Sequence, residues 1–231
     1  MSGIWETSTR LFEMLALADR WLDDRKRRLF AVACCRRFTP HFRDRRSLEA
    51  LDVAQRYADG RASEEERQGV EQAALDVYMT VRERWSDEYS LVRWDRQDEV
   101  LARAALSAIA VGKFHAEDAA DRARWAVSAG GRGWHAEQDE EAAQCALLRE
   151  IIGPFPVRDV PVDPFWLAAN DGAAAQLARW IEERSAFEDL LILADALEEA
   201  GCADAAILDH CRRPGEHVAG CWVVDLVLGK S

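Results

Sequence analysis

Residues Phe187–Lys230 read FEDLLILADALEEAGCADAAILDHCRRPGEHVAGCWVVDLVLGK, and the three apolar runs of this stretch decide the fold. Apolar residues recur at three- and four-residue spacing over 190–197, which predicts an amphipathic helix that Gly201 ends. Asp204 can cap a second helix, which Pro214 ends. The last apolar run, 221–228, is interrupted only by Asp225, so we expect it to lie within the core.

A buried Asp225 needs a partner, and Arg212 and Arg213 are the nearest candidates in the sequence. The segment Trp222–Leu228 is also the one place where an alternating, strand-like pattern can be read. Elsewhere the apolar residues keep a helical period. The predicted helices cover 9–23, 24–37, 47–58, 63–85, 95–127, 137–152 and 173–184, with a short one from Pro164 and a loop over 86–91. We therefore predict an all-α fold, a multi-helix bundle.

Four prolines lie between Gly153 and Pro164, and they predict an extended connector. This divides the chain into a helical bundle over 1–152, the proline-rich connector over 153–164 and a C-terminal helical unit over 165–231. We expect the C-terminal unit to pack on the bundle. Whether the two form one domain or two stays open at this point.

The chain has 231 residues and a net charge of -12, which disfavours nucleic acid as a partner. No leader and no apolar run long enough for a membrane span is present in the sequence, so we expect a cytoplasmic protein that does not enter a membrane. In a reducing compartment its six cysteines are expected to stay as thiols, and most of them to be buried.

The densest group of metal-ligand side chains lies near the C-terminus. It consists of Cys202, His210, Cys211, His217 and Cys221. His217 and Cys221 stand four positions apart, as chelating pairs in zinc sites do, and adjacent His210 and Cys211 point to different sides of a helix, so one of them at most can join. The leading interpretation is that these thiols are core residues and that no cofactor is bound; zinc is the alternative.

Two further groups could carry chemistry. Cys34 and Cys35 precede Arg36 and Arg37, whose charge would lower a thiol pKa, as a redox sensor requires. The segment 20–46 holds ten Lys and Arg against three Asp, a local charge of +7 that leaves -19 for the remainder. Its arginines could bind an anion, although docking against the acidic remainder is the simpler interpretation. The candidate anion-binding residues are Arg25, Arg28, Arg36 and Arg37.

Several catalytic patterns are missing from the sequence. No histidine has a glutamate three residues before it, as in di-iron bundles, and there is no zincin, nucleophile-elbow or Walker motif. The nine tryptophans are scattered along the chain, which favours core packing or a partner-binding surface over a stacking platform for bases. We therefore expect no enzymatic activity.

Three stretches carry a resemblance: DRKRRLFAVACCRRF, LDVAQRYADG and the residues from LILADALEEAG to the C-terminal VLGK. They resemble a family of bacterial proteins found in many divergent copies in large genomes, for which no function is assigned. LADALEEAG is also similar to the L-A-D-x-L-E-E-x-G core of a short bacterial repeat-companion domain. The resemblance covers both ends of the chain better than its alanine-rich middle, and it implies a common scaffold with a variable centre.

Three functions are compatible with these observations. The first is a cytoplasmic helical module that binds another protein and has no catalytic activity. The second is a metal-binding or redox-responsive protein that uses the Cys and His group. The third is an enzyme that acts on an anionic substrate at the basic N-terminal hairpin.

Overall fold

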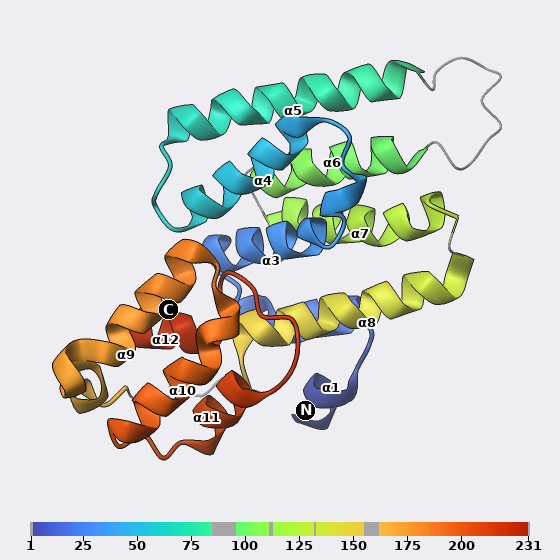
Figure 1. Ribbon diagram of the computed structural model, residues 1–231. Coiled ribbons are helices and arrows are strands. Elements are labelled where there is room, and N and C mark those ends of the chain that lie inside the picture. The colour runs from blue at the N-terminus through green and yellow to red at the C-terminus, as the bar shows by residue number, and fades with distance from the viewer. Residues whose placement is uncertain (1, 85–95, 111–112, 132, 155–161, 231) are drawn as a thin grey trace. The chain divides into compact units, whose positions relative to one another are not determined.

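The computed structural model describes residues 2–84, 96–110, 113–131, 133–154 and 162–230. Within these ranges the chain forms twelve α-helices and no strand, which confirms the predicted all-α, multi-helix fold (Figure 1). The helices are α1 (Ser2–Thr7), α2 (Leu11–Ala18), α3 (Asp24–Arg36), α4 (Arg45–Ala58), α5 (Glu64–Arg84), α6 (Gln97–Ile109), α7 (Lys113–Ala129), α8 (Gly133–Ile152), α9 (Pro164–Arg184), α10 (Leu190–Glu199), α11 (Ala205–Arg212) and α12 (Trp222–Leu228).

The chain divides into two compact units. Unit 1 comprises Met1–Glu6 together with Arg149–Ser231, and unit 2 comprises Thr7–Leu148. The predicted connector over 153–164 falls largely on residues 155–161, which lie outside the described ranges, as does the predicted loop over 86–91. The division at the connector, and the packing of the C-terminal helices on the bundle, therefore stay predictions.

Unit 2 is a bundle in which α3, α4, α5, α6 and α7 pack against one another. The starts of α3, α4 and α5 are determined by local sequence, because at each N-terminus a polar side chain accepts a backbone N–H. Asp23 accepts from the Lys26 amide (2.7 Å), Asp44 from the Arg46 amide (2.9 Å), and Ser63 from the Glu66 amide (3.1 Å). The core is rich in alanine, which lets the helix axes approach closely.

The single helix predicted over 95–127 is wrong. Its sequence forms two helices, α6 and α7, because the backbone of Ala110 leaves helical geometry (φ -64°, ψ 163°). The Arg28 guanidinium Nη1 donates to the carbonyl oxygens of Ile109 (2.8 Å) and Ala110 (2.9 Å) at the end of α6. A long-range donor thus satisfies carbonyls that a continuous helix would have bonded internally.

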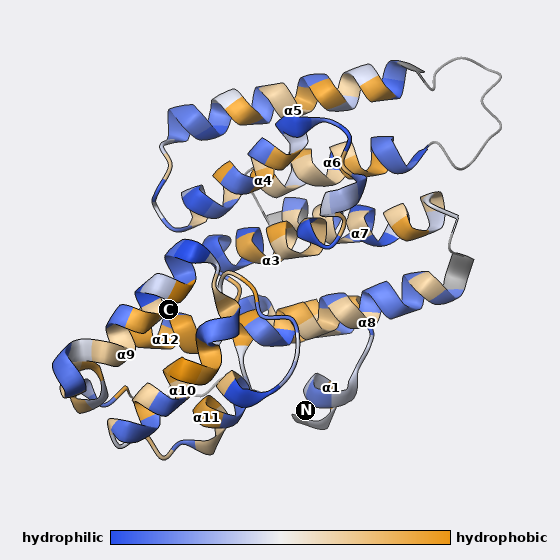
Figure 2. Ribbon diagram, in the orientation of Figure 1, coloured by the Kyte–Doolittle hydropathy of each residue, from blue (hydrophilic) through white to orange (hydrophobic). Residues whose placement is uncertain are grey.

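Unit 1 has its own core, formed by α9, α10, α11 and α12. Asp163 and Asp204 cap α9 and α11, as their positions predict. The sequence Asn170-Asp171-Gly172 favours a turn, and it forms a kink inside α9, where the three residues have φ between 52° and 78°. The strand-like pattern at Trp222–Leu228 is α12, a helix that is hydrophobic over most of its length (Figure 2).

The N-terminal residues belong to unit 1 as well. Trp5 is 1% exposed, and its indole Nε1 donates to the carbonyl of Gly153 (3.1 Å), 148 positions further on. Arg149 Nε donates in turn to the Trp5 carbonyl (2.7 Å). Because the partners are so far apart in sequence, no local pattern predicts that Trp5 joins the C-terminal helices.

A candidate metal-binding site in unit 1

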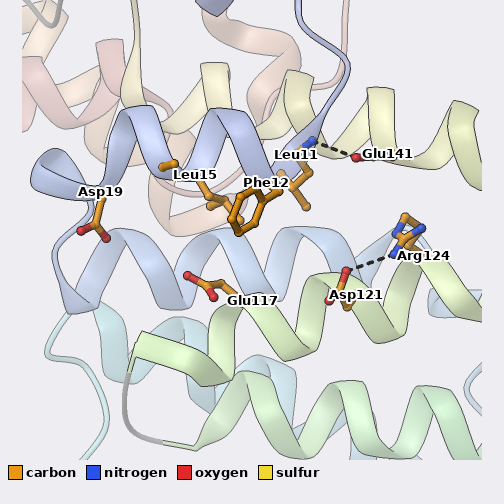
Figure 3. Close-up of a pocket in the computed structure, with 9 residues that line it drawn as sticks. Leu11, Phe12, Leu15, Asp19, Glu117, Asp121, Arg124 and Glu141 are labelled. Atoms are coloured by element: carbon orange, nitrogen blue, oxygen red, sulfur yellow. Dashed lines mark hydrogen bonds and ion pairs between the residues drawn. The ribbon is translucent and has the colours of Figure 1, made fainter.

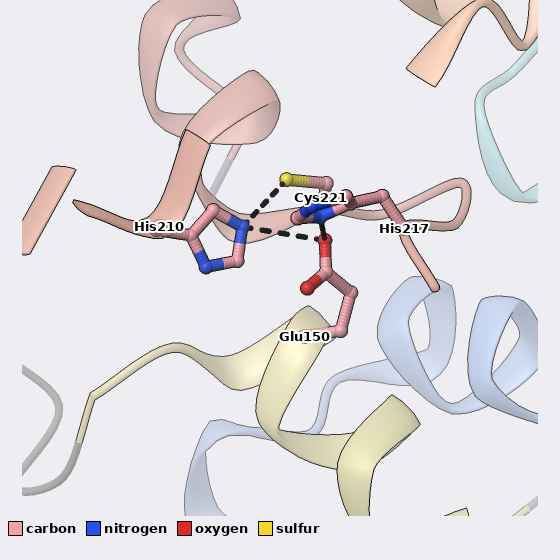
Figure 4. Close-up of side chains that lie close together, drawn as sticks. All are labelled: Glu150, His210, His217 and Cys221. Atoms are coloured by element: carbon pink, nitrogen blue, oxygen red, sulfur yellow. Dashed lines mark hydrogen bonds and ion pairs between the residues drawn. The ribbon is translucent and has the colours of Figure 1, made fainter. Parts of the chain in front are cut away.

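Four side chains with metal-ligand atoms meet in unit 1: Glu150, His210, His217 and Cys221. The carboxylate oxygen, the two imidazole nitrogens and the sulfur all lie within 4.8 Å of one another. Figure 4 shows them pointing toward a common centre from separate segments of the chain. The side chains of Glu150, His210 and His217 are 0%, 6% and 8% exposed, and as whole residues three of the four are buried while His217 is partly exposed.

Local sequence places each of these residues. Glu150 lies in the last turn of α8, which ends at Ile152 and is followed by Gly153 with φ +87°. His210 lies on the buried face of α11, one turn after Ile207. The loop after α11 carries His217, and Cys221 is the N-cap residue of α12.

Glu150 is the acceptor at the centre of the group. Its Oε1 lies 2.9 Å from His217 Nδ1 and 3.3 Å from His210 Nε2, and its Oε2 accepts from Arg213 Nη2 at 2.6 Å. Burial alone would raise the pKa of Glu150, but the bonds from the two histidines outweigh it and hold the pKa well below its usual range. Glu150 is therefore a buried carboxylate whose charge is fully compensated.

The two histidines respond differently to this carboxylate. The bond to Glu150 raises the pKa of His217 although the ring is buried, and its Nε2 faces the carbonyl of Arg213 at 3.4 Å. Burial lowers the pKa of His210 in spite of Glu150. His217 is thus the more basic of the two histidines beside Glu150.

The tautomer of His210 follows from its neighbour Trp222. The indole Nε1–H of Trp222 is a donor only, and it lies 2.9 Å from His210 Nδ1, so Nδ1 accepts. A neutral ring with an acceptor at Nδ1 carries its proton on Nε2. That proton is shared between Glu150 Oε1 and the Cys221 sulfur, which lies 3.2 Å from Nε2.

Cys221 is a protonated thiol in this arrangement. Burial raises its pKa well above the ordinary thiol value, and the negative charge of Glu150 adds to the rise. Backbone N–H groups of Val223 and Val224, at the start of α12, act in the opposite direction. Without a positive ion beside it, the sulfur therefore does not ionise at neutral pH.

The predicted metal set is brought together in part. His210, His217 and Cys221 lie in the group, whereas Cys202 and Cys211 lie in the apolar core of unit 1. Of the adjacent pair, His210 is the one whose ring reaches the site, in agreement with the expectation that only one could. Cys202 and Cys211 do not complete a set, and Glu150 occupies the place that the prediction gave to them.

Glu150 was missed because it lies 60 positions before His210 and carries no motif. A weak signal is present in the sequence LLREII: a glutamate stands within an apolar run whose members Leu147, Leu148, Ile151 and Ile152 are all buried. A charged side chain at a core-facing position requires a partner, which indicates a site.

The four arginines of the anion-binding prediction each have a partner within the protein. Arg25, Arg36 and Arg37 bond Asp59, Asp52 and Glu140, at 2.8, 2.7 and 3.0 Å. Arg28 bonds the carbonyls at the end of α6. An anion would have to displace four different acceptors, so the hairpin offers no ready-made anion site.

The partners expected for Asp225 also lie elsewhere. Arg212 bonds Asp195 (2.9 Å) and Glu198 (2.6 Å), while Arg213 bonds Glu150. Asp225 itself is 3% exposed.

The lowered thiol pKa expected at Cys34 and Cys35 is not found at Cys35. Both thiols are 0% exposed, and burial raises the pKa of Cys35 to about 12, with Arg36 lowering it only slightly in comparison. Desolvation outweighs the neighbouring positive charge because the arginine side chains point away to carboxylates. Burial therefore disfavours the thiolate form of Cys35.

Comparison with known proteins yields no match to a family profile, a curated protein or a solved structure. Among the helices of the described ranges, none combines the length and the apolar character that crossing a lipid bilayer requires. The assignment of function thus depends on the residues of the site.

Proposed function

We propose that unit 1 is a metal-binding module whose Glu150, His210, His217 and Cys221 hold one zinc ion as a structural crosslink. The observation that carries the proposal is the convergence of four ligand atoms of zinc-type chemistry within 4.8 Å, on three buried residues and the partly exposed His217. Four protein ligands without an open position are typical of structural zinc sites.

The distances support a tetrahedral ion. With metal–ligand bonds of about 2.0–2.3 Å, neighbouring ligand atoms in a tetrahedron lie about 3.3–3.8 Å apart. The closest contacts in the group are 2.9, 3.2 and 3.3 Å. A central ion needs these contacts to open by a few tenths of an ångström, and the widest pair, within 4.8 Å, to close.

The second ring nitrogen of His217 is already placed for this role. When Nδ1 binds the metal, the proton on Nε2 points at the Arg213 carbonyl, the kind of outer partner that fixes a ligating imidazole. Ligation also needs Cys221 as a thiolate, so metal binding releases protons.

His210 imposes a condition. Binding through Nε2 puts the proton of a neutral ring on Nδ1, where it would face the N–H of Trp222. The hydrogen-bonded network and the metal site are therefore alternative states of the same residues, and metal binding has to break the Trp222 bond. We expect the fluorescence of Trp222 to change when zinc binds.

Elemental analysis of the purified full chain, after loading with zinc and desalting, tests the proposal. We expect about one zinc per chain, and replacement by Co²⁺ should give the visible bands of a tetrahedral ion with sulfur-to-cobalt charge transfer. Cys221→Ala should lose both signals.

Cys202→Ala is the matched control, since Cys202 is a buried thiol of the same unit outside the group. It should keep the zinc and the cobalt spectrum. Circular dichroism shows whether each variant is folded. A folded wild-type chain without bound metal, or equal metal content in the Cys221 variant, would contradict the proposal and leave the hydrogen-bonded network as the role of these residues.

A second function, the protein-interaction module, is favoured by the exposed apolar side chains. Among the described residues, the large apolar side chains with at least 40% exposure are Ile4, Phe12, Met79, Trp125, Phe165, Trp180, Leu191 and Ile192. Peptides selected from a displayed library should include binders whose affinity falls with Phe12→Ser or Ile192→Ser. A selection that yields no such binder would count against this function. The cytoplasmic location and the bacterial origin stay predictions.

A further inference from the structure

Unit 2 contains a pocket of about 490 Å³ beside helix α2. Leu11, Phe12 and Leu15 extend from α2 toward α7, and the facing side chains on α7 are charged (Figure 3). The pocket thus has one apolar wall and one polar wall.

Phe12 is the most exposed large apolar residue among those described, at 83%. Its neighbours Leu11 and Met14 are buried, so α2 is anchored on one face while the phenyl ring is left beside the pocket. An apolar partner that covers such a ring gains about 25 cal/mol of binding free energy for each Å² of apolar surface removed from water. A single exposed ring is common on protein surfaces, so the charge of the pocket has to decide what partner fits.

The polar side of the pocket is acidic. It carries Asp19, Glu117, Asp121 and Glu141 against the single cation Arg124. Three of these carboxylates are engaged: Asp19 by Arg27, Asp121 by Arg124, and Glu141 by the Leu11 amide.

Glu117 differs from the other three carboxylates. Within the part of the chain that the structure describes, it has neither a hydrogen-bond nor an ion-pair partner, and it is only partly exposed. A carboxylate facing an apolar wall across a pocket can accept from a cation that arrives beside an apolar group.

We propose that this pocket binds a segment of a partner protein that presents a large apolar side chain next to a lysine or arginine. The apolar side chain packs on Phe12 and Leu15, and the cation bonds Glu117. The inference rests on the interaction function above and names its partner class. The net charge of -12 attracts basic partners in general, so the test has to separate the pocket from that background.

Fluorescence polarisation with three labelled peptides tests this inference on the full chain. The probes are a short amphipathic helix of leucine, alanine and lysine, and two twins with glutamine or glutamate in place of every lysine. We expect the lysine peptide to bind about tenfold more tightly than the glutamine twin and the glutamate twin to bind weakest. Phe12→Ser and Glu117→Lys should each weaken the lysine peptide about fivefold.

Two controls match these substitutions. Phe165→Ser removes a ring that is 68% exposed in unit 1, and Glu65→Lys reverses an exposed charge on α5. Both should leave binding within about twofold.

The possible failures are distinguishable. Equal effects of the controls and the pocket variants would show a general attraction to an acidic protein and overturn the inference. Binding of the glutamine twin with the same affinity, still sensitive to Phe12→Ser, would keep the interaction function and overturn the basic partner. No binding by any of the three peptides would overturn the inference, and the library selection would then decide the interaction function separately.

Discussion

Replacing Glu150 by glutamine is the sharpest perturbation of unit 1, because it keeps the size of the side chain and removes its charge. The carboxylate is 0% exposed and accepts from Arg213, His217 and His210. A glutamine offers one acceptor oxygen, and its amide group adds two donors where only donors surround it. Without metal, the Glu150→Gln variant should therefore be less stable than the wild-type protein.

The magnitude follows from the three contacts. The bond to His217 is buried and charge-assisted, at 2.9 Å, and is worth about 1.5–3 kcal/mol. The Arg213 side chain is 46% exposed, so solvent screening leaves its contribution at about 1 kcal/mol or less. His210, at 3.3 Å, adds little. We expect Glu150→Gln to lower the free energy of unfolding by about 2–4 kcal/mol.

The loss should depend on pH in a defined way. The pKa of Glu150 is lowered in the folded state, so its contribution is complete above the ordinary carboxyl pKa of about 4.3 and declines as the pH falls toward the folded pKa. The pKa of His217 is raised, so its contribution is complete below the ordinary imidazole pKa of about 6.5 and is lost as the pH rises through the folded pKa. The difference between wild type and variant is therefore largest between about pH 4.5 and 6.5.

Urea denaturation of chelator-treated protein, followed by circular dichroism from pH 3.5 to 9, measures this difference. Glu198→Gln is the matched control, because Glu198 also bonds an arginine at 2.6 Å but has a 55% exposed side chain. It should cost under about 1 kcal/mol. A loss below 1 kcal/mol for the Glu150 variant, or a difference that does not change with pH, would refute the reasoning.

Three further outcomes are expected. Trp222→Phe removes the donor that opposes a proton on His210 Nδ1, so it should tighten Co²⁺ binding about three- to tenfold in a spectroscopic titration; weaker binding would contradict the tautomer argument. Arg28→Leu removes the side-chain donor of the Ala110 carbonyl and the nearer of two donors to the Ile109 carbonyl, which Arg67 also bonds at 3.3 Å, so it should cost about 1–3 kcal/mol in urea denaturation, against under about 1 for Arg36→Ala, whose ion pair is exposed. All six thiols are buried, and the pKa of Cys35 is raised to about 12, so a thiol reagent at neutral pH should label them only after denaturation; rapid labelling of Cys35 in the native protein would be inconsistent with this burial.

The sequence predicts the fold where the determining contacts are local. Helices α3, α5 and α11 each begin after a polar residue whose side chain accepts a backbone N–H two or three positions further on. These residues are Asp23, Ser63 and Asp204. The break at Ala110 could not be predicted in this way, because the donor that satisfies the end of α6 is Arg28, 82 positions earlier. Helical periodicity alone continues through such a break.

The site residues divide in the same way into those placed by local sequence and those placed by long-range contacts. His217 and Cys221 could be paired from their spacing, whereas the choice between His210 and Cys211 stayed open in the sequence and is made by the structure. Glu150 comes from a different helix and reaches them through tertiary packing alone, so spacing rules for chelating pairs pass over it. The direction of the thiol pKa at Cys35 was also wrong from sequence, because neighbouring charges are visible in a sequence whereas burial is not.

The bond between Trp5 and Gly153 has a consequence for synthesis of the chain. During synthesis, all residues of unit 2 are made before most residues of unit 1. Helix α1, which carries Trp5, is made long before Gly153, whose carbonyl accepts from the Trp5 indole. Trp5 therefore cannot make this bond until Gly153 has been added, 148 positions later. Unit 1 therefore assembles from residues made before and after unit 2, whereas unit 2 is continuous in sequence and has the chance to fold first.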